Sequence, residues 1–181
     1  NAESNGDYSP LDPFGKRDLL IGSQNNISVA ENDGSGNFST STALDNLGGF
    51  VRSVKPLRLN SDSLSDLVYL LDQQGVYFAL QGDDGFSQGK SINDDISKPQ
   101  SLEVYHYQDQ ETNAIKPILL VGVPSSDSST EPKIYQFSPP VFVETDTSWR
   151  FHEKFELKLS GINGSISGMQ VVDLDRAYNF Y

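Results

Sequence analysis

Cysteine is absent from this sequence of 181 residues, and basic residues are scarce. Without Cys the chain forms no disulfide, no thiolate metal site and no thiol nucleophile. Thirteen Lys and Arg oppose 25 Asp and Glu, which gives a formal net charge of −12. This charge repels the phosphates of nucleic acids and the headgroups of anionic lipids, so we expect no nucleic-acid partner.

Long apolar runs are also lacking. The longest, Ile118 to Val123, contains a Gly and is far shorter than the roughly 20 residues of a membrane-spanning helix. We therefore expect no membrane insertion by this segment. The apolar content, 36% of the chain with ten Phe and eight Tyr, is nevertheless enough for a packed core. The chain is thus predicted to be globular rather than disordered.

Groups that carry out catalysis are few. The sequence has two His, His106 and His152, each in an aromatic-rich stretch predicted to be a strand. Such a setting is typical of a packed or surface imidazole. Adjacent Asp residues at 83–84 and 94–95 fall in turns, where carboxylates are usually solvated. The sequence therefore predicts no catalytic residue and a protein that is not an enzyme.

A repeat runs through the chain. The segment DLLIG, from Asp18, is followed by a polar turn, by ISVA and by a Gly-rich turn that ends at Phe38. The segment DLVYL, from Asp66, is followed by the same succession and ends at Phe86. Each Asp lies 20 positions before its Phe. We expect the two Phe rings to occupy matching core positions.

A third, looser copy begins near Pro117, continues through Lys133–Phe137 and ends in an outer segment, Trp149–Leu159. Short runs rich in Val, Ile, Tyr and Phe between Gly, Asn, Asp and Ser are typical of antiparallel strands joined by tight turns. Three further apolar segments complete the pattern as first strands, and these are Phe50–Leu59, Leu102–Tyr107 and Ile166–Leu174.

A period of about fifty residues with about four strands fits the blades of a β-propeller. We expect an all-β fold, a β-propeller segment of about three and a half four-stranded antiparallel blades. The predicted repeats are 1–49, 50–97 and 98–161, with the start of the next blade at 162–181. Since a ring needs at least about four blades, the remaining blades are expected from chain beyond residue 181 or from another subunit. The isolated chain is accordingly expected to self-associate.

Two stretches allow another interpretation. Apolar residues between Leu64 and Leu71 also have helical spacing, but the aligned DLLIG segment does not, which favours a strand. Thr42–Leu47 is short and runs into two Gly, so we expect a turn there. The run Gly34–Gly36 lacks the Lys-Ser or Lys-Thr of a phosphate-binding loop, and we expect a hairpin turn.

The DLLIG and DLVYL segments and the turn NDGSGNF resemble the FG-GAP or VCBS repeat family, whose repeats form the blades of integrin-α-like β-propellers. The resemblance covers three copies and the start of a fourth. It implies a calcium loop of the form D-x-[DN]-x-D-G-x-x-D before each DLLVG-like strand. It also implies adhesion or ligand binding by loops at the rim of the ring.

The calcium loops match this pattern only in part. Calcium takes six to eight oxygen ligands, which alternate acidic and amide side chains of a tight loop supply. The loop that starts at Asp109 keeps Glu111 and Asn113 and is the best candidate calcium site. The loops at 10–18 and 173–181 keep fewer ligands.

The remaining loop keeps Asn60, Asp62 and Asp66 but begins with Arg58. A guanidinium at this position could pair with Asp62 or Asp66 in place of the metal. In every loop the alternative to a calcium site is an ordinary polar turn, whose side-chain oxygens cap backbone N–H groups. Calcium is therefore a candidate cofactor, and no other is predicted.

We expect a non-catalytic binding, adhesion or assembly scaffold outside the cytoplasm, either secreted or periplasmic. Its expected ligand is a protein or a glycan. Two alternatives stay open. One is a part of a propeller enzyme that acts on polysaccharides, and the other is a filament or matrix component joined by strand addition.

Overall fold

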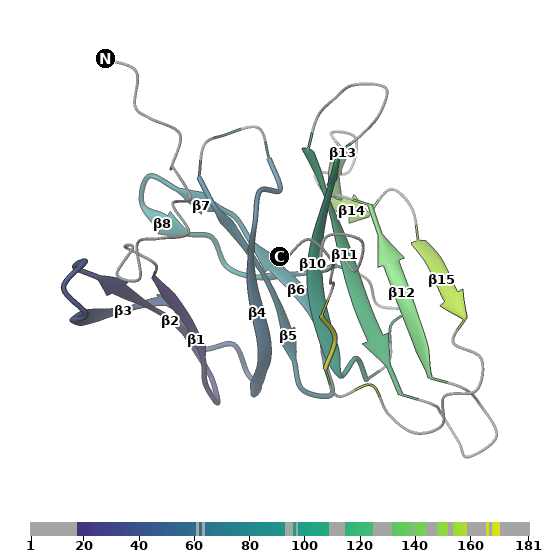
Figure 1. The fold of residues 1–181 in the computed structure, drawn as a ribbon, viewed down its shortest axis with the longest axis horizontal. Coiled ribbons are helices and arrows are strands. Elements are labelled where there is room, and N and C mark those ends of the chain that lie inside the picture. Colours follow the sequence, from purple (N-terminus) through teal and green to yellow (C-terminus); the bar gives the residue numbers. More distant parts are fainter. Residues whose placement is uncertain are drawn as a thin grey trace, which may run out of the picture.

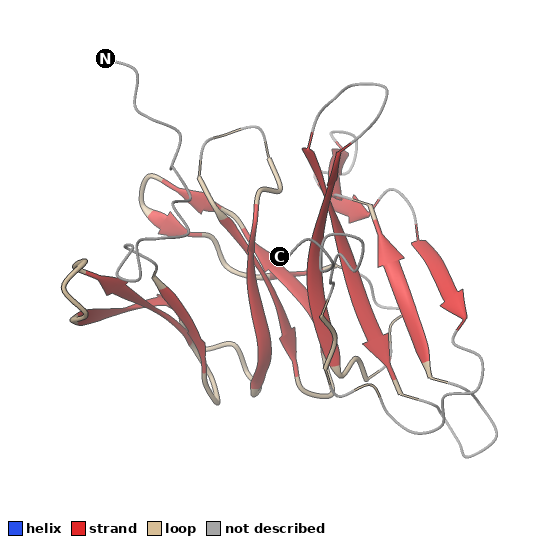
Figure 2. Ribbon diagram, in the orientation of Figure 1, coloured by secondary structure: helices blue, strands red, loops and turns tan. Residues whose placement is uncertain are grey.

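The computed structural model describes residues 18–60, 62, 64–92, 96, 98–108, 115–124, 132–138, 140–143, 148–151, 154–158, 166 and 168–170. Every regular element in these residues is a β-strand (Figure 2). The prediction of an all-β fold is therefore confirmed for these residues. Within this part of the chain no helix is long and apolar enough to cross a membrane. The predicted boundaries between repeats stay a prediction.

The described strands form three main antiparallel sheets, each ordered as the chain runs (Figure 1). The first sheet contains β1 (Leu19–Gly22), β2 (Ile27–Asn32) and β3 (Phe38–Leu44). The middle sheet contains β4 (Val51–Leu57), β5 (Asp66–Leu71), β6 (Gly75–Ala79) and β9 (Lys90–Ser91). The third sheet contains β10 (Ser101–Gln108), β11 (Ile115–Val123), β12 (Lys133–Phe137) and β15 (Lys154–Lys158).

Small hairpins separate the third and fourth strands of two sheets. In the middle sheet the hairpin is β7 (Gln81–Gly82) with β8 (Gly85–Phe86), and in the third sheet it is β13 (Pro140–Val143) with β14 (Ser148–Phe151). The predicted outer segment Trp149–Leu159 is thus wrong as one strand. Trp149 pairs with Phe142 in the hairpin, and the outer strand begins at Lys154. The apolar run just before it offers Trp149 a nearer partner, because a short loop costs less entropy to close.

The three sheets pack face to face, and the middle sheet is covered on both sides (Figure 1). Its strand β5 is buried at every position. Leu67, Tyr69 and Leu71 pack toward the first sheet, whereas Val68 and Leu70 pack toward the third. Burial on both faces requires an uninterrupted apolar run. For this reason the apolar residues of β5 also have the helical spacing noted between Leu64 and Leu71.

Two cores lie between the sheets. Beside the β5 residues, Ile27 and Leu44 of the first sheet and Val51 and Ala79 of the middle sheet form the first core. The second core lies between the middle and third sheets and is larger. Its buried members are Leu57, Leu59, Val68, Leu70, Val76, Phe78, Ile92, Ile96, Leu102, Leu119, Val121 and Phe137.

The first and middle sheets share one register. Leu19 pairs with Ala30 in the first sheet as Leu67 pairs with Ala79 in the middle sheet. Further along, Asn32 pairs with Phe38 as Gln81 pairs with Phe86. The hairpin from Leu67 to its partner Ala79 is one residue longer than the hairpin from Leu19 to Ala30. The hairpin from Gln81 to its partner Phe86 is one residue shorter than the hairpin from Asn32 to Phe38. The two differences cancel, which explains the equal spacing of 20 residues.

The third sheet follows the same register one residue away from the predicted position. Leu119 and Val121 are buried against the middle sheet, as Leu67 and Tyr69 are buried against the first. Ile118 therefore matches Asp66, and the predicted match at Pro117 is wrong by one position. The direction of the side chains decides which residues of β11 and β5 match, because a shift of one residue turns every side chain of a strand to the opposite face.

Two turn predictions have different outcomes. Residues Asp33 to Asn37 connect β2 to β3, so the Gly-rich run is a hairpin turn, as predicted. The turn predicted at Thr42–Leu47 is wrong in its first half. Thr42 pairs with Ser28 in β3, and Leu44 is buried in the first core, so the apolar end of this segment completes a strand.

Candidate functional site

The predicted calcium ligands of the loop before β5 bind backbone groups. Asn60 Oδ1 accepts a hydrogen bond from the N–H of Asp62 (3.1 Å), and Asp62 Oδ1 accepts one from the N–H of Leu64 (2.9 Å). Both bonds span two residues, the pattern in which Asx side chains stabilise turns. This arrangement is the one that the polar-turn interpretation predicts.

Asp66 is fully buried and fastens three segments of the middle sheet. Its Oδ2 accepts a hydrogen bond from the N–H of Leu59 (2.7 Å), and its Oδ1 accepts one from the N–H of Gln81 (2.9 Å). In the first sheet Asp18 Oδ1 accepts the matching bond from the N–H of Asn32 (2.9 Å). The repeated Asp therefore holds the start of one strand to the end of the next, and at Asp66 this carboxylate is buried.

The possible pairing of Arg58 with Asp62 or Asp66 does not form among the described residues. Arg58 is exposed, and the described residues show no ion pair from it to Asp62 or Asp66. Asp109, Glu111 and Asn113 lie outside the described residues. In the rest of the chain that the structure covers, no group of three or more His, Asp or Glu could hold a metal ion.

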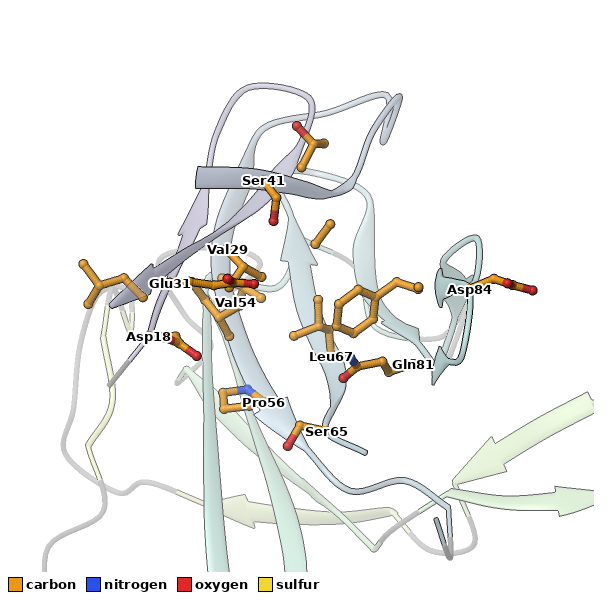
Figure 3. A pocket seen from close by; sticks show the side chains of 16 residues that line it. Asp18, Val29, Glu31, Ser41, Val54, Pro56, Ser65, Leu67, Gln81 and Asp84 are labelled. Atoms are coloured by element: carbon orange, nitrogen blue, oxygen red, sulfur yellow. The ribbon is translucent and has the colours of Figure 1, made fainter. Parts of the chain in front are cut away.

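The described residues form a groove of about 860 Å³ between the first and middle sheets (Figure 3). Strands β1, β2 and β3 supply one wall. Strands β4 and β5 and the β7–β8 hairpin supply the other. Its lining combines apolar side chains, among them Val54, Leu67 and Phe86, with polar ones such as Ser41 and Gln81.

Carboxylates give the groove its charge. Asp18, Glu31 and Asp84 line it, and the described lining residues include no Lys, Arg or His. Figure 3 shows Asp18 and Glu31 toward one end and Asp84 at the other, with Leu67 and Gln81 between them. All three carboxylates are exposed. The groove is therefore a negatively charged surface with an apolar floor.

The described candidates for catalysis are exposed and lie on different elements. His106 is exposed on β10, and Asp83 and Asp84 are exposed at the tip of the β7–β8 hairpin, as predicted for solvated turn residues. His152 and the Asp residues at 94–95 lie outside the described residues. Trp149 belongs to strand β14.

Sequence reasoning missed the groove residues Glu31 and Phe86 as members of one site, and it treated Asp84 only as part of a solvated pair. One signal was available. When ISVAEN is aligned with VYFALQ, Glu31 stands where the middle sheet has Leu80. An acidic residue at a repeat position that is otherwise apolar and faces inward breaks the packing pattern, and such exceptions are typical of functional sites.

Comparison with known proteins gives no match. No family model matches this chain, and no curated protein or solved structure does so either.

Proposed function

We propose that this chain is a segment of a β-propeller that acts as a non-catalytic binding or assembly scaffold outside the cytoplasm. The observation that carries the proposal is the outer face of the first sheet. Leu19, Ile21 and Phe38 share this face, and they are 49%, 43% and 46% exposed. Clustered exposed apolar residues are typical of a surface that another element covers.

The shared register says what kind of element fits there. Leu19, Ile21 and Phe38 match Leu67, Tyr69 and Phe86 of the middle sheet. Leu67 and Tyr69 are 1% exposed there, because the first sheet covers them, and Phe86 packs against the same core. The outer face of the first sheet thus has the side chains that bind a preceding sheet. Stacked sheets of one kind around an axis are what a propeller requires.

The first strands support the same proposal. Lys55 on β4 and Glu103 on β10 occupy matching positions, and Lys55 Nζ lies 3.0 Å from both carboxylate oxygens of Glu103. In a propeller the first strands surround the axis, so matching residues of neighbouring blades meet at one height. The ion pair fits that arrangement.

The step from one sheet to the next supports it too. A Cβ at Gly22 would lie 2.6 Å from Val51 Cγ1, where the chain enters the middle sheet. Gly122 is the matching residue of the third sheet, and a Cβ there would lie 3.0 Å from Ile166 Cγ2. Ile166 therefore lies over the third sheet as Val51 lies over the first. Unlike Val51, it is in no strand, and the described residues 166 and 168–170 form none of the predicted first strand.

Self-association of the 181-residue chain tests the proposal. We expect oligomers in light scattering at micromolar concentration, because apolar side chains are exposed on both outer sheets, among them Ile21 on the first and Phe155 on the third. The double variant Leu19→Lys/Ile21→Lys is expected to reduce association without lowering the melting temperature. The control Gln24→Lys/Ser35→Lys adds the same charge at exposed turn positions and is expected to change little. A wild-type chain that stays monomeric and binds no hydrophobic dye would contradict the proposal.

Calcium at the loop of Asp109, Glu111 and Asn113 is part of the proposal as the resemblance implies it. A ligand that binds only the folded state stabilises it by about 2.7 kcal/mol when the ligand concentration is about a hundred times Kd. We expect a calcium-dependent rise in melting temperature that Asp109→Ala removes and Asp62→Ala does not. Equal melting with calcium and with chelator would contradict a site in this loop.

A further inference from the structure

The groove between the first and middle sheets exists because three of its lining positions have smaller or more polar side chains than the matching positions of the second core. On the wall from the first sheet, Val29 and Glu31 stand where the middle sheet has Phe78 and Leu80. Phe78 is buried in the second core, and Leu80 packs against it. The first sheet therefore leaves open the space that those two side chains fill.

The opposite wall repeats the difference. Pro56 and Ala79 of the middle sheet match Val104 and Phe137 of the third. Phe137 is fully buried in the second core and Val104 packs against that core, whereas Pro56 is exposed and lines the groove. Ala79 is fully buried in the first core and does not line the groove, so on this wall the smaller lining side chain is Pro56. The groove is a consequence of the sequence of these strands, and the register itself would allow a filled core.

The charge of the groove points to a cationic occupant. Glu31 introduces a carboxylate at a position where the neighbouring sheet has an apolar side chain, and Asp18 and Asp84 add two more. A cleft lined by charges of one sign focuses the field and attracts counter-charged ligands. Because the carboxylates lie toward opposite ends of the groove (Figure 3), a single amine would meet only one end.

The floor points to a ligand with apolar stems. Val54, Leu67 and Phe86 lie in the groove, and its volume of about 860 Å³ is within the size range of ligand sites. Lys and Arg side chains place their methylene stems along apolar surface and keep the charged group in polar surroundings. An extended peptide with separated basic residues satisfies both the floor and the two charged ends.

We propose that this groove binds an extended peptide segment that carries at least two Lys or Arg residues. The site goes beyond the scaffold function proposed above and does not depend on it, since its lining residues come from the first and middle sheets, the segments beside them and the β7–β8 hairpin. Its specificity rests on charge at the ends and apolar contact between them.

Fluorescence anisotropy with a labelled peptide of alternating Lys and Val tests the proposal on the 181-residue chain. We expect binding that weakens as salt increases, because exposed charges are screened. A peptide of alternating Glu and Val is expected not to bind. Spermidine is expected to compete poorly, because it lacks side chains for the floor. Displacement by spermidine as effective as by the unlabelled peptide would overturn the peptide assignment.

Paired variants separate the groove from the general negative charge of the chain. Glu31→Gln/Asp84→Asn is expected to weaken peptide binding by roughly tenfold. Asp45→Asn/Asp62→Asn removes the same charge at exposed positions outside the groove and is expected to leave binding nearly unchanged. An equal loss in both double variants would overturn the proposal, because it would show attraction to net charge alone.

A filling variant tests the cavity itself. Glu31→Leu places at this position the residue that packs into the second core, and we expect it to abolish peptide binding while the melting temperature stays equal or rises. Glu31→Lys is expected to weaken binding of the Lys-containing peptide and to strengthen binding of the Glu-containing peptide. Unchanged binding of the Lys-containing peptide by folded Glu31→Leu protein would overturn the assignment of the groove.

Discussion

The space between the first and middle sheets and the space between the middle and third sheets use the same positions of one register, yet only the second space is filled. Phe78 and Phe137 are both buried in the second core. Their matches in the first space are Val29 and Ala79. A repeated register therefore determines where side chains face, while their volumes determine whether two sheets enclose a core or leave a groove.

The first space still holds the sheets together at one end. Ile27 and Leu44 of the first sheet are buried against Leu67 and Leu71 of the middle sheet. Burial of each such side chain contributes about 1.5–3 kcal/mol. The first sheet is therefore attached by a small core beside an open groove, and mutations at matching positions of the two spaces should differ in effect.

The largest expected difference is at Phe78 and its match Val29. Phe78→Ala removes a ring that is 1% exposed and should lower the free energy of unfolding by about 3–5 kcal/mol. Val29→Ala removes a side chain that lines the groove and should cost about 1 kcal/mol. Urea unfolding measures both. Equal costs at the two positions would show that the spaces are equally packed.

The two repeated Asp residues should differ nearly as much. Asp66→Ala leaves the N–H groups of Leu59 and Gln81 without their acceptor inside the protein, at about 1–3 kcal/mol for each. Asp18→Ala frees an exposed N–H of Asn32, which water can satisfy, and should cost about 1 kcal/mol or less. Chemical denaturation of both variants checks the order, and Asp66→Asn should fall between them.

Added volume should have opposite effects in the two spaces. Val121→Phe inserts a ring into the packed second core, and we expect a loss of about 1–3 kcal/mol. Val29→Phe places the same ring in the groove, where the change should be neutral or stabilising by about 1 kcal/mol. Thermal melting separates the two outcomes. A destabilised Val29→Phe variant would argue against the open groove.

Alkaline pH should weaken the first core through Tyr69. Burial, with a smaller contribution from Tyr77, raises the pKa of Tyr69 to about 12 from 10.0. The unfolded chain loses this proton near pH 10, whereas the folded chain keeps it. The contribution of Tyr69 to stability is therefore full below pH 10 and is lost as the pH rises to about 12. In urea titrations at several pH values Tyr69→Phe should reduce the loss, and Tyr105→Phe, at an exposed ring, should not.

The smallest effect is expected at the ion pair between the first strands. Lys55 and Glu103 are partly exposed, with side-chain exposures of 33% and 16%. A double-mutant cycle with Lys55→Gln and Glu103→Gln should give a coupling of about 0.5–1 kcal/mol that decreases with salt. A coupling of zero at low salt would mean that matching first-strand positions do not interact.

Much of the fold could be predicted from the sequence, because a strand is a local pattern. Runs such as DLLIG and VYFAL specified antiparallel strands, and Asp18 and Asp66 marked the repeat. The third copy was misplaced by one residue, since Ile118 replaces the marking Asp. The candidate site was not predicted, because Glu31 and Asp84 lie far apart in the sequence and have no motif in common.

The sequence by itself determined the all-β character and the repeated strand order, because turn residues and β-branched runs act over a few positions. Only the tertiary structure decided that Asp66 is buried and accepts hydrogen bonds from two other segments, that β5 is covered on both faces, and that the first two sheets leave a charged groove. These properties depend on volumes and charges contributed by strands about fifty residues apart, and a pattern within one strand carries no information about the strand that will face it.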